Sequence, residues 1–243
     1  RTRSRPPGST RPVDSIRSVR RSGLSLLSGN GSAVVPVTMA GGDLRAASDP
    51  ICVVGFPSLK DFHAALLYTA PTMGSTAAER FLALSLAGAR RTMYISNSYF
   101  VPDDDFRRML IAAAKRGVDV RILVPGEKID IKTTWYAGRR RYEELLIGGV
   151  RIYEYQPSMM HAKTFVIDGV WSTIGTMNID NRSLAFNDES NIVAFDRALG
   201  AEMDAIFLED LKYSKEIKLE EFRRRPKYQK LFERAAHLFS RVL

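Results

Sequence analysis

The sequence predicts an α/β protein in which a mixed, largely parallel β-sheet is covered by helices on both faces. Segments with strand periodicity alternate with helical segments, and strands separated by helices imply parallel crossovers. Residues 118–124 form an almost continuous apolar run, which is typical of a central strand buried on both faces. The chain has 243 residues, of which 45% are hydrophobic, so it can fill a core of this kind.

The first part of the pattern contains three helices, each followed by a strand. Thr76 and Glu79 have the spacing of a capping box, which marks the start of the first helix. Acidic side chains favour helix N-termini and glycine favours helix ends, so residues 103–105 and Gly117 bound the second helix. A Gly-Gly pair at 148–149 ends the third. The elements are expected at residues 76–88 (helix), 91–98 (strand), 103–117 (helix), 118–124 (strand), 132–147 (helix) and 150–155 (strand).

The next stretch is predicted to form a β-hairpin. Residues 161–167 alternate as a strand, Asp168-Gly169 is a strong signal for a two-residue turn, and residues 170–175 return as the partner strand. Beyond the hairpin we expect a strand at 192–195 and a helix at 197–213. Four apolar residues of this helix are expected to face the core: Met203, Ile206, Phe207 and Leu211.

The ends of the chain differ from this central region. Residues 1–70, mostly rich in Arg, Ser, Gly and Pro, are predicted to be disordered or unassigned, although they contain apolar patches at 51–56 and 64–68. Residues 71–213 are predicted to form the ordered domain. Residues 214–243 are expected to form a basic amphipathic helical tail, in which seven apolar residues share one helical face: Leu231, Phe232, Ala235, Leu238, Phe239, Val242 and Leu243.

The net charge of +9 favours a polyanionic partner, whether nucleic acid, an anionic membrane or a phosphorylated substrate. Residues 1–22 contain seven arginines and one acid, Asp14, so most of this charge lies in this N-terminal segment. The single cysteine, Cys52, cannot form an internal disulfide, and no apolar run is long enough for a transmembrane helix. We therefore expect an intracellular protein.

The candidate active site is built on the predicted hairpin. His161 and Lys163 lie two residues apart in a strand and so point to one side. Such a pair suits phosphodiester chemistry, because the lysine binds a phosphate oxygen while the histidine attacks phosphorus or passes a proton to the leaving oxygen. Thr176 and Asn178 can donate to further phosphate oxygens, and Glu189 offers a carboxylate to orient the imidazole. A His-x-Lys pair alone is usually a surface feature, but these additional residues favour an active site.

These residues resemble the signature of the phospholipase D superfamily, which is His-x-Lys, four residues, Asp, then Gly, a small hydroxyl residue and an Asn two positions further on. The segments 97–102, 161–169 and 178–183 are similar to the C-terminal half of bacterial cardiolipin synthases. The resemblance covers about Thr72 to Leu243 and implies that residues 71–213 are a phospholipase D-like catalytic half-domain. Asp168 belongs to the signature, and its place at the hairpin turn suggests that it fixes loop geometry more than it touches substrate.

The resemblance also implies a reaction that needs no metal and no cofactor. The histidine of the family attacks phosphorus to form a covalent phosphohistidine, a role that falls to His161 or to its counterpart in another half-site. Lys163 and Asn178 would cradle the phosphate with Thr176 nearby, and Glu189 matches the carboxylate that holds the histidine.

The chain departs from the family pattern in carrying one motif where related proteins carry two. Two histidines are required, because one attacks while the other protonates the leaving alcohol. His63 has no lysine two positions on, and His237 lies in the predicted C-terminal helix. Either two chains pair so that two copies of His161 face each other, or the chain is an incomplete, inactive half.

Three functions follow from these observations. The first is a phosphatidyltransferase of the cardiolipin synthase type, acting on an anionic, phosphatidylglycerol-like phospholipid, with a second half-site in trans. The second is a single-motif, metal-independent homodimeric nuclease, which the Arg-rich N-terminus favours. The third is an inactive truncated half. The tail at 227–243 either lies in an anionic membrane surface or docks on the sheet, and under the first function the protein would be cytoplasmic and peripheral on the inner membrane.

Overall fold

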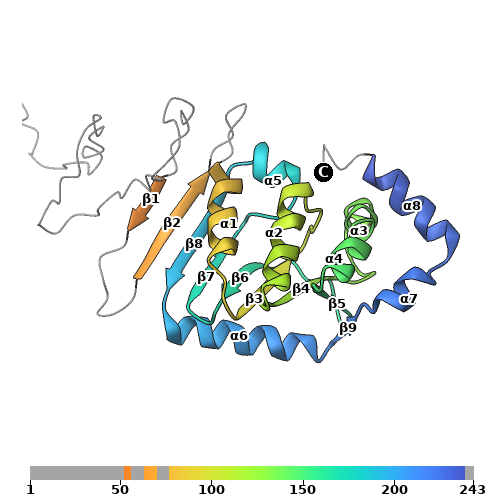
Figure 1. Ribbon diagram of the computed structural model, residues 1–243. Coiled ribbons are helices and arrows are strands. Elements are labelled where there is room, and N and C mark those ends of the chain that lie inside the picture. Colours follow the sequence, from red (N-terminus) through yellow and green to blue (C-terminus); the bar gives the residue numbers. More distant parts are fainter. Residues whose placement is uncertain (1–51, 56–62, 70–76, 239–243) are drawn as a thin grey trace, which may run out of the picture. The chain divides into compact units, whose positions relative to one another are not determined.

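The computed structural model of the protein describes residues 52–55, 63–69 and 77–238. Within these residues, nine strands form one sheet in the order β1-β2-β8-β7-β6-β3-β4-β5-β9 (Figure 1). The strands are β1 (Cys52–Gly55), β2 (His63–Thr69), β3 (Thr92–Asn97), β4 (Asp119–Pro125), β5 (Arg151–Tyr155), β6 (Lys163–Ile167), β7 (Trp171–Gly175), β8 (Glu189–Phe195) and β9 (Ser214–Glu216). The helices are α1 (Ala77–Ala87), α2 (Asp104–Lys115), α3 (Lys132–Arg139), α4 (Tyr142–Ile147), α5 (Asn181–Ala185), α6 (Arg197–Leu211), α7 (Leu219–Arg223) and α8 (Lys227–His237).

The sheet is mixed, as the sequence predicts, but the expectation that parallel pairs dominate is wrong. Only β3 with β4 and β4 with β5 pair in parallel, while the other neighbours pair antiparallel. Parallel neighbours need a crossover connection, which α2 and the α3–α4 pair provide. The β6–β7 connection is instead the predicted tight hairpin, with Asp168 and Gly169 both at positive φ.

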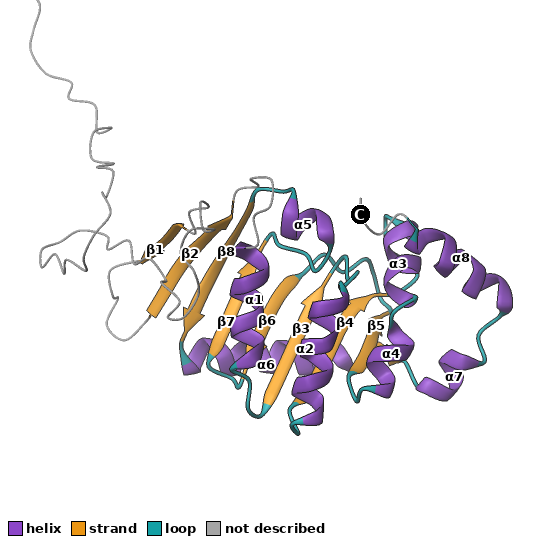
Figure 2. Cartoon of the chain, turned by 45° about the horizontal axis from the view of Figure 1, so that its top comes forward, coloured by secondary structure: helices purple, strands orange, loops and turns teal. Residues whose placement is uncertain are grey.

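Helices cover both faces of the sheet, as predicted. Figure 2 shows α1 and α2 on one face and α6 on the other. The larger core joins the sheet to α1, α2, α4 and α5, and includes Leu82, Leu110 and Phe165. The smaller core lies under α6, where the ring of Phe207 stacks on that of Tyr94 with centroids 4.8 Å apart. Met203 and Phe207 are buried as predicted, whereas Ile206 is exposed.

The helix expected at 132–147 is interrupted, and α3 and α4 replace it. Two contacts hold the end of α3 at this place. Gly138 lies so close to the backbone of Phe100 that a Cβ would come within 2.2 Å of the carbonyl oxygen. Arg139, the next residue, turns inward to form an ion pair with Glu154 of β5. The chain therefore leaves the helix at residues 140–141 before α4 begins.

Two strands lie within residues 1–70, so the prediction that this segment is disordered or unassigned is wrong for residues 52–55 and 63–69. The apolar patches at 51–56 and 64–68 correspond to β1 and β2, and β2 pairs along its length with β8. The remainder of residues 1–70, the predicted cap at Thr76 and residues 239–243 lie outside the described part of the chain. In the predicted tail, β9 pairs with β5, and α7 and α8 follow. No helix among the described residues is long and apolar enough to cross a bilayer.

Candidate active site

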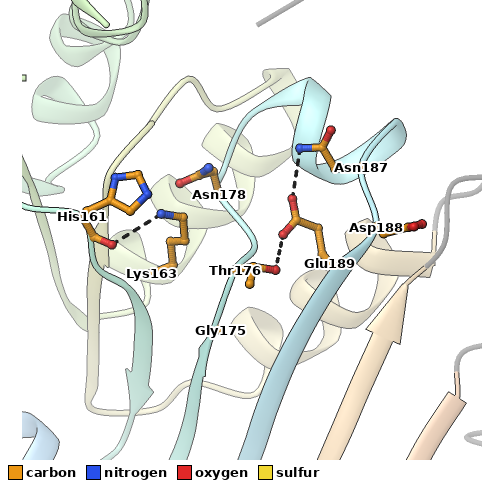
Figure 3. Close-up of a pocket in the computed structure, with 8 residues that line it drawn as sticks. All are labelled: His161, Lys163, Gly175, Thr176, Asn178, Asn187, Asp188 and Glu189. Atoms are coloured by element: carbon orange, nitrogen blue, oxygen red, sulfur yellow. Dashed lines mark hydrogen bonds between the residues drawn. The ribbon is translucent and has the colours of Figure 1, made fainter. Parts of the chain in front are cut away.

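A pocket of about 580 Å³ opens at the edge of the sheet where β7 ends and where β6 and β8 begin (Figure 3). The sequence motif and the segment after the hairpin both contribute side chains to it. Its lining residues are His161, Lys163, Gly175, Thr176, Asn178, Asn187, Asp188 and Glu189. The structure thus brings together five of the six predicted site residues, and only Asp168 lies elsewhere.

His161 lies in the loop before β6, which begins at Lys163 and not at His161 as expected. Its imidazole is exposed to the pocket and meets the Tyr99 ring edge to face, with ring centroids 5.6 Å apart. The Tyr99 hydroxyl donates a hydrogen bond of 2.8 Å to Asp130. Burial and this hydrogen bond raise the pKa of Tyr99 to about 12, so the ring beside His161 stays neutral at physiological pH.

Lys163 is 8% exposed and is held by neighbouring oxygens. Its Nζ lies 3.2 Å from the Ser98 hydroxyl and 3.4 Å from the His161 carbonyl oxygen. Ser98 in turn donates to the carbonyl oxygen of Ala162 at 3.0 Å. Burial lowers the pKa of Lys163 below its ordinary value, although the negative charge of Glu189 opposes this effect. These two contacts fix the buried ammonium toward the pocket. They leave its third N–H available to donate to a further acceptor.

Glu189 makes different contacts from those expected. Its carboxylate accepts hydrogen bonds from the Thr176 hydroxyl and from the Asn187 amide, the latter at 3.3 Å. Within the described part of the chain, no hydrogen bond joins Glu189 to His161. Figure 3 shows these two side chains on opposite sides of Lys163 and Asn178. In this chain, Glu189 therefore contacts Thr176 and Asn187, and its role in orienting the imidazole stays a prediction.

The loop after β7 presents Asn178 and Asp180 at the same edge of the sheet. Asn178 lines the pocket, and its buried Oδ1 has no partner within the described chain. Asp180 caps α5 by accepting a hydrogen bond of 2.7 Å from the Ser183 amide. Burial raises the pKa of Asp180 to about 6, and the nearby charge of Glu189 acts in the same direction. The loop is tied to β3, because Asn97 accepts a hydrogen bond of 3.1 Å from the Ile179 amide.

Asp168 lies at the far end of β6, away from the pocket. Its carboxylate accepts hydrogen bonds from the amides of Arg90, Arg91 and Thr92 at 3.0, 2.7 and 3.0 Å. Burial alone would raise the pKa of this carboxyl, but the three amides together lower it below its ordinary value. Asp168 therefore joins the hairpin turn to the start of β3.

His237 does not line the pocket. His63 is the first residue of β2, and His237 on α8 contacts the Arg141 guanidinium at 2.7 Å. The pocket thus holds a single imidazole among the described residues. No group of three or more His, Cys, Asp or Glu side chains in the described ranges could hold a metal ion. The arrangement offers a nucleophile, an ammonium and amide and hydroxyl groups around one cavity.

Two residues of this site were missed by sequence reasoning. Ser98 and Tyr99 lie in the run that resembles cardiolipin synthases, yet nothing in their local pattern indicated contact with His161 or Lys163. Only the pairing of β3 with β6 brings them to the pocket, because Asn97 is the register partner of Lys163.

Comparison with known protein families gives a match to the family described as "Cardiolipin synthase, PLD-like domain" over residues 82–211. A cardiolipin synthase of Geobacillus sp. (strain WCH70) is 40% identical over 158 residues, which cover 65% of this chain and 31% of that protein. Cardiolipin synthase 2 of Bacillus anthracis is 38% identical over 158 residues, with 65% of this chain and 30% of that protein covered. The chain therefore spans about a third of the length of these relatives.

Solved structures share the fold. A phosphatidylserine synthase from Haemophilus influenzae Rd KW20 superposes with a TM-score of 0.61 at 17% identity, covering 76% of this chain and 49% of that one. Nuc from Salmonella typhimurium, a phospholipase D family member, gives a TM-score of 0.54 at 17% identity, covering 64% of this chain and 97% of that one. With a family match over more than half of its length, the chain belongs to the phospholipase D-like domain family of cardiolipin synthases.

Proposed function

We propose that this chain supplies one half of a phosphatidyl-transfer site of the cardiolipin synthase type, with the second half-site supplied in trans. The substrate would be an anionic phospholipid such as phosphatidylglycerol. The observation that carries the proposal is the convergence of His161, Lys163 and Asn178 on one pocket in a chain of this family.

In the first step, an imidazole nitrogen of His161 attacks the phosphorus of the phosphodiester. A phosphorus–nitrogen bond forms, the bond from phosphorus to the leaving alcohol oxygen breaks, and that oxygen takes a proton from the second half-site. Lys163 and Asn178 would hold the phosphoryl oxygens, and the ammonium would stabilise the charge that builds on them. Thr176, fixed by Glu189, lies at the same pocket.

In the second step, an acceptor hydroxyl attacks the phosphohistidine. The phosphorus–nitrogen bond breaks, the acceptor oxygen binds phosphorus, and the acceptor proton passes to the general base of the second half-site. The imidazole of His161 is regenerated. The reaction needs one nucleophile and two proton transfers, to the leaving alcohol and from the acceptor. The pocket holds one imidazole among the described residues, and this supports the requirement for a partner site.

Because such a substrate resides in a bilayer, the protein would act as a peripheral protein on the cytoplasmic side of the inner membrane.

A single-motif homodimeric nuclease is the second candidate. It is favoured by the single imidazole of the described pocket and by the arginines of residues 1–22. Binding of this kind would depend on phosphate contacts and would weaken steeply with salt.

In the test, the purified chain is incubated with vesicles of labelled phosphatidylglycerol and, separately, with DNA. We expect a labelled lipid product, and a phosphatidyl adduct on His161 detected by intact-mass spectrometry after an alkaline quench. Sedimentation measured in parallel should show that the active species is paired. DNA cleavage without lipid turnover would establish the nuclease, whereas a paired protein without either activity would support the inactive half.

A further inference from the structure

The C-terminal helix α8 packs on the body of the protein through its polar side. It lies against α3, with Glu233 fully buried and Ala236 nearly so. An amphipathic helix on a globular protein ordinarily turns its apolar face inward. In α8 and at its C-cap, every apolar residue except Ala236 faces outward, and we call these residues the α8 stripe: Tyr228, Leu231, Phe232, Ala235 and Leu238. Tyr228, Leu231, Phe232 and Leu238 are 59%, 65%, 54% and 82% exposed.

Buried ion pairs fix this orientation. Arg225 binds the Glu233 carboxylate through two nitrogens, at 2.9 Å from Nε and 2.6 Å from Nη2. Arg139 of α3 lies 3.7 Å from the same carboxylate and also pairs with Glu154 of the sheet. Turning α8 so that the stripe faced inward would expose Glu233 and leave the buried Arg225 guanidinium without its carboxylate partner, which is costly. The stripe therefore stays outward.

The charges of α8 complement an anionic surface. Lys227 and Arg234 are exposed and lie along one border of the stripe, and the exposed Arg224 precedes the helix. The single acidic residue of α8 is Glu233, and its charge is neutralised on the inner side. An outward apolar stripe bordered by cations is the arrangement of helices that lie in the headgroup region of anionic bilayers.

We propose that the α8 stripe docks the protein on an anionic lipid bilayer, with its apolar side chains in the headgroup boundary and with Lys227 and Arg234 against lipid phosphates. That this bilayer also supplies the substrate rests on the proposed function, which docking through α8 would make more specific. Figures 1 and 2 both draw the C-terminal end of α8 toward the end of the sheet where α5 lies. The pocket opens at that end, so docking would bring the bilayer near it.

The test is flotation of the full chain with vesicles of phosphatidylcholine alone or mixed with phosphatidylglycerol. The stripe variant is Leu231→Ser/Leu238→Ser, which spares Phe232 because its ring contacts Tyr136 of α3. We expect wild type to float only with the mixed vesicles. The stripe variant should bind them on the order of a hundredfold more weakly, about tenfold for each leucine. Lys227→Glu/Arg234→Glu should also lose binding, and added salt should weaken the wild type.

The matched control is Ile147→Ser/Ile206→Ser, because these isoleucines are 60% and 57% exposed on α4 and α6. It should float like wild type. Flotation of the stripe variant at the wild-type level would overturn the proposal. A second outcome would also overturn it: a wild type that is dimeric without lipid and a stripe variant that is monomeric, because a second copy of the chain would then cover the stripe.

His161→Ala separates this proposal from the proposed function. It should float like wild type, because His161 lies outside the stripe. If wild type floats but turns over no phosphodiester, docking stands and the proposed function fails. If the stripe variant floats while wild type makes lipid product, the function stands and docking by α8 fails.

Discussion

The Ser98 hydroxyl accepts a hydrogen bond from the ammonium of Lys163 at 3.2 Å and donates its own hydrogen to the Ala162 carbonyl. One buried side chain thus links the end of β3 to the Lys163 side chain and to the segment that carries His161. Ser98 acts as a positioning residue for the proposed reaction, because it holds the cation at the pocket without lining it.

Replacing Ser98 by Ala removes both contacts, so Lys163 should lose its fixed position and kcat should fall about 10- to 100-fold, with a smaller change in KM. The control is Ser172→Ala in β7, where the buried hydroxyl has no hydrogen-bond partner within the described chain. Steady-state kinetics on labelled phosphatidylglycerol should show full activity for that control. Equal losses in the two variants would mean that Ser98 serves packing alone.

Tyr99 is expected to position the His161 imidazole through its ring. Tyr99→Phe retains the edge contact and loses only the hydrogen bond to Asp130, so its kcat should stay within about threefold of wild type. Tyr99→Ala removes the ring and should lower kcat about 10- to 100-fold. If Tyr99→Phe proves as defective as Tyr99→Ala, the hydroxyl and not the ring is the functional group.

Asp168 should matter for stability more than for catalysis. Asp168→Ala removes three amide contacts and should lower the free energy of unfolding by about 1–3 kcal/mol. Asp168→Asn tolerates the positive φ and should lose less. Because the pKa of Asp168 is lowered in the folded state, its contribution is present above the ordinary value and is lost as pH falls through the folded pKa.

Thermal unfolding measured across the acidic range checks this prediction, and kcat measured at a temperature where each variant is folded separates stability from catalysis. A large loss of kcat in fully folded Asp168→Asn would contradict a purely structural role.

Asp180 should have the opposite effect on the pH dependence of stability. Its pKa rises from 3.8 to about 6 on folding, so the folded state binds more protons between these values and stability falls as pH rises through this window. Asp180→Asn keeps a cap oxygen for Ser183 and removes the buried charge. It should raise the free energy of unfolding by about 1–3 kcal/mol at neutral pH and by little below about pH 4.

Chemical denaturation at a series of pH values tests this difference, which should grow with pH until the Asp180 carboxyl is fully ionised. A difference of the same size at every pH would show that packing, and not ionisation, separates the two proteins.

His161→Ala should abolish turnover and the covalent adduct, because the nucleophile is lost. Glu189→Gln should reduce kcat severely, about 100-fold, because Thr176 and Asn187 donate to different carboxylate oxygens and the substitution replaces one of these oxygens by an NH2 donor. His237→Ala is the control, since His237 lies on α8 outside the pocket. Full turnover by His161→Ala would rule out the proposed mechanism.

Sequence patterns that lie within a few neighbouring residues predict their local structure correctly. The Asp168-Gly169 turn needs positive φ at two adjacent positions, and such a turn joins β6 to β7. Asp103 caps α2 with a hydrogen bond of 2.7 Å to the Phe106 amide, as its place at the predicted helix start indicated. The strands β1 and β2 could not be found in this way, because β2 is completed by β8, more than a hundred residues later in the chain.

The sequence by itself determined the fold class, the hairpin and five residues that line the pocket, because the spacing of short motifs carries this information. Tertiary structure alone decided that Ser98 holds Lys163 and that Glu189 contacts Thr176 in place of His161. It also decided that the apolar stripe of α8 faces outward. These outcomes depend on strand register and on buried ion pairs between distant segments, such as Arg139 with Glu233. No local period encodes such contacts, so only the folded chain reveals them.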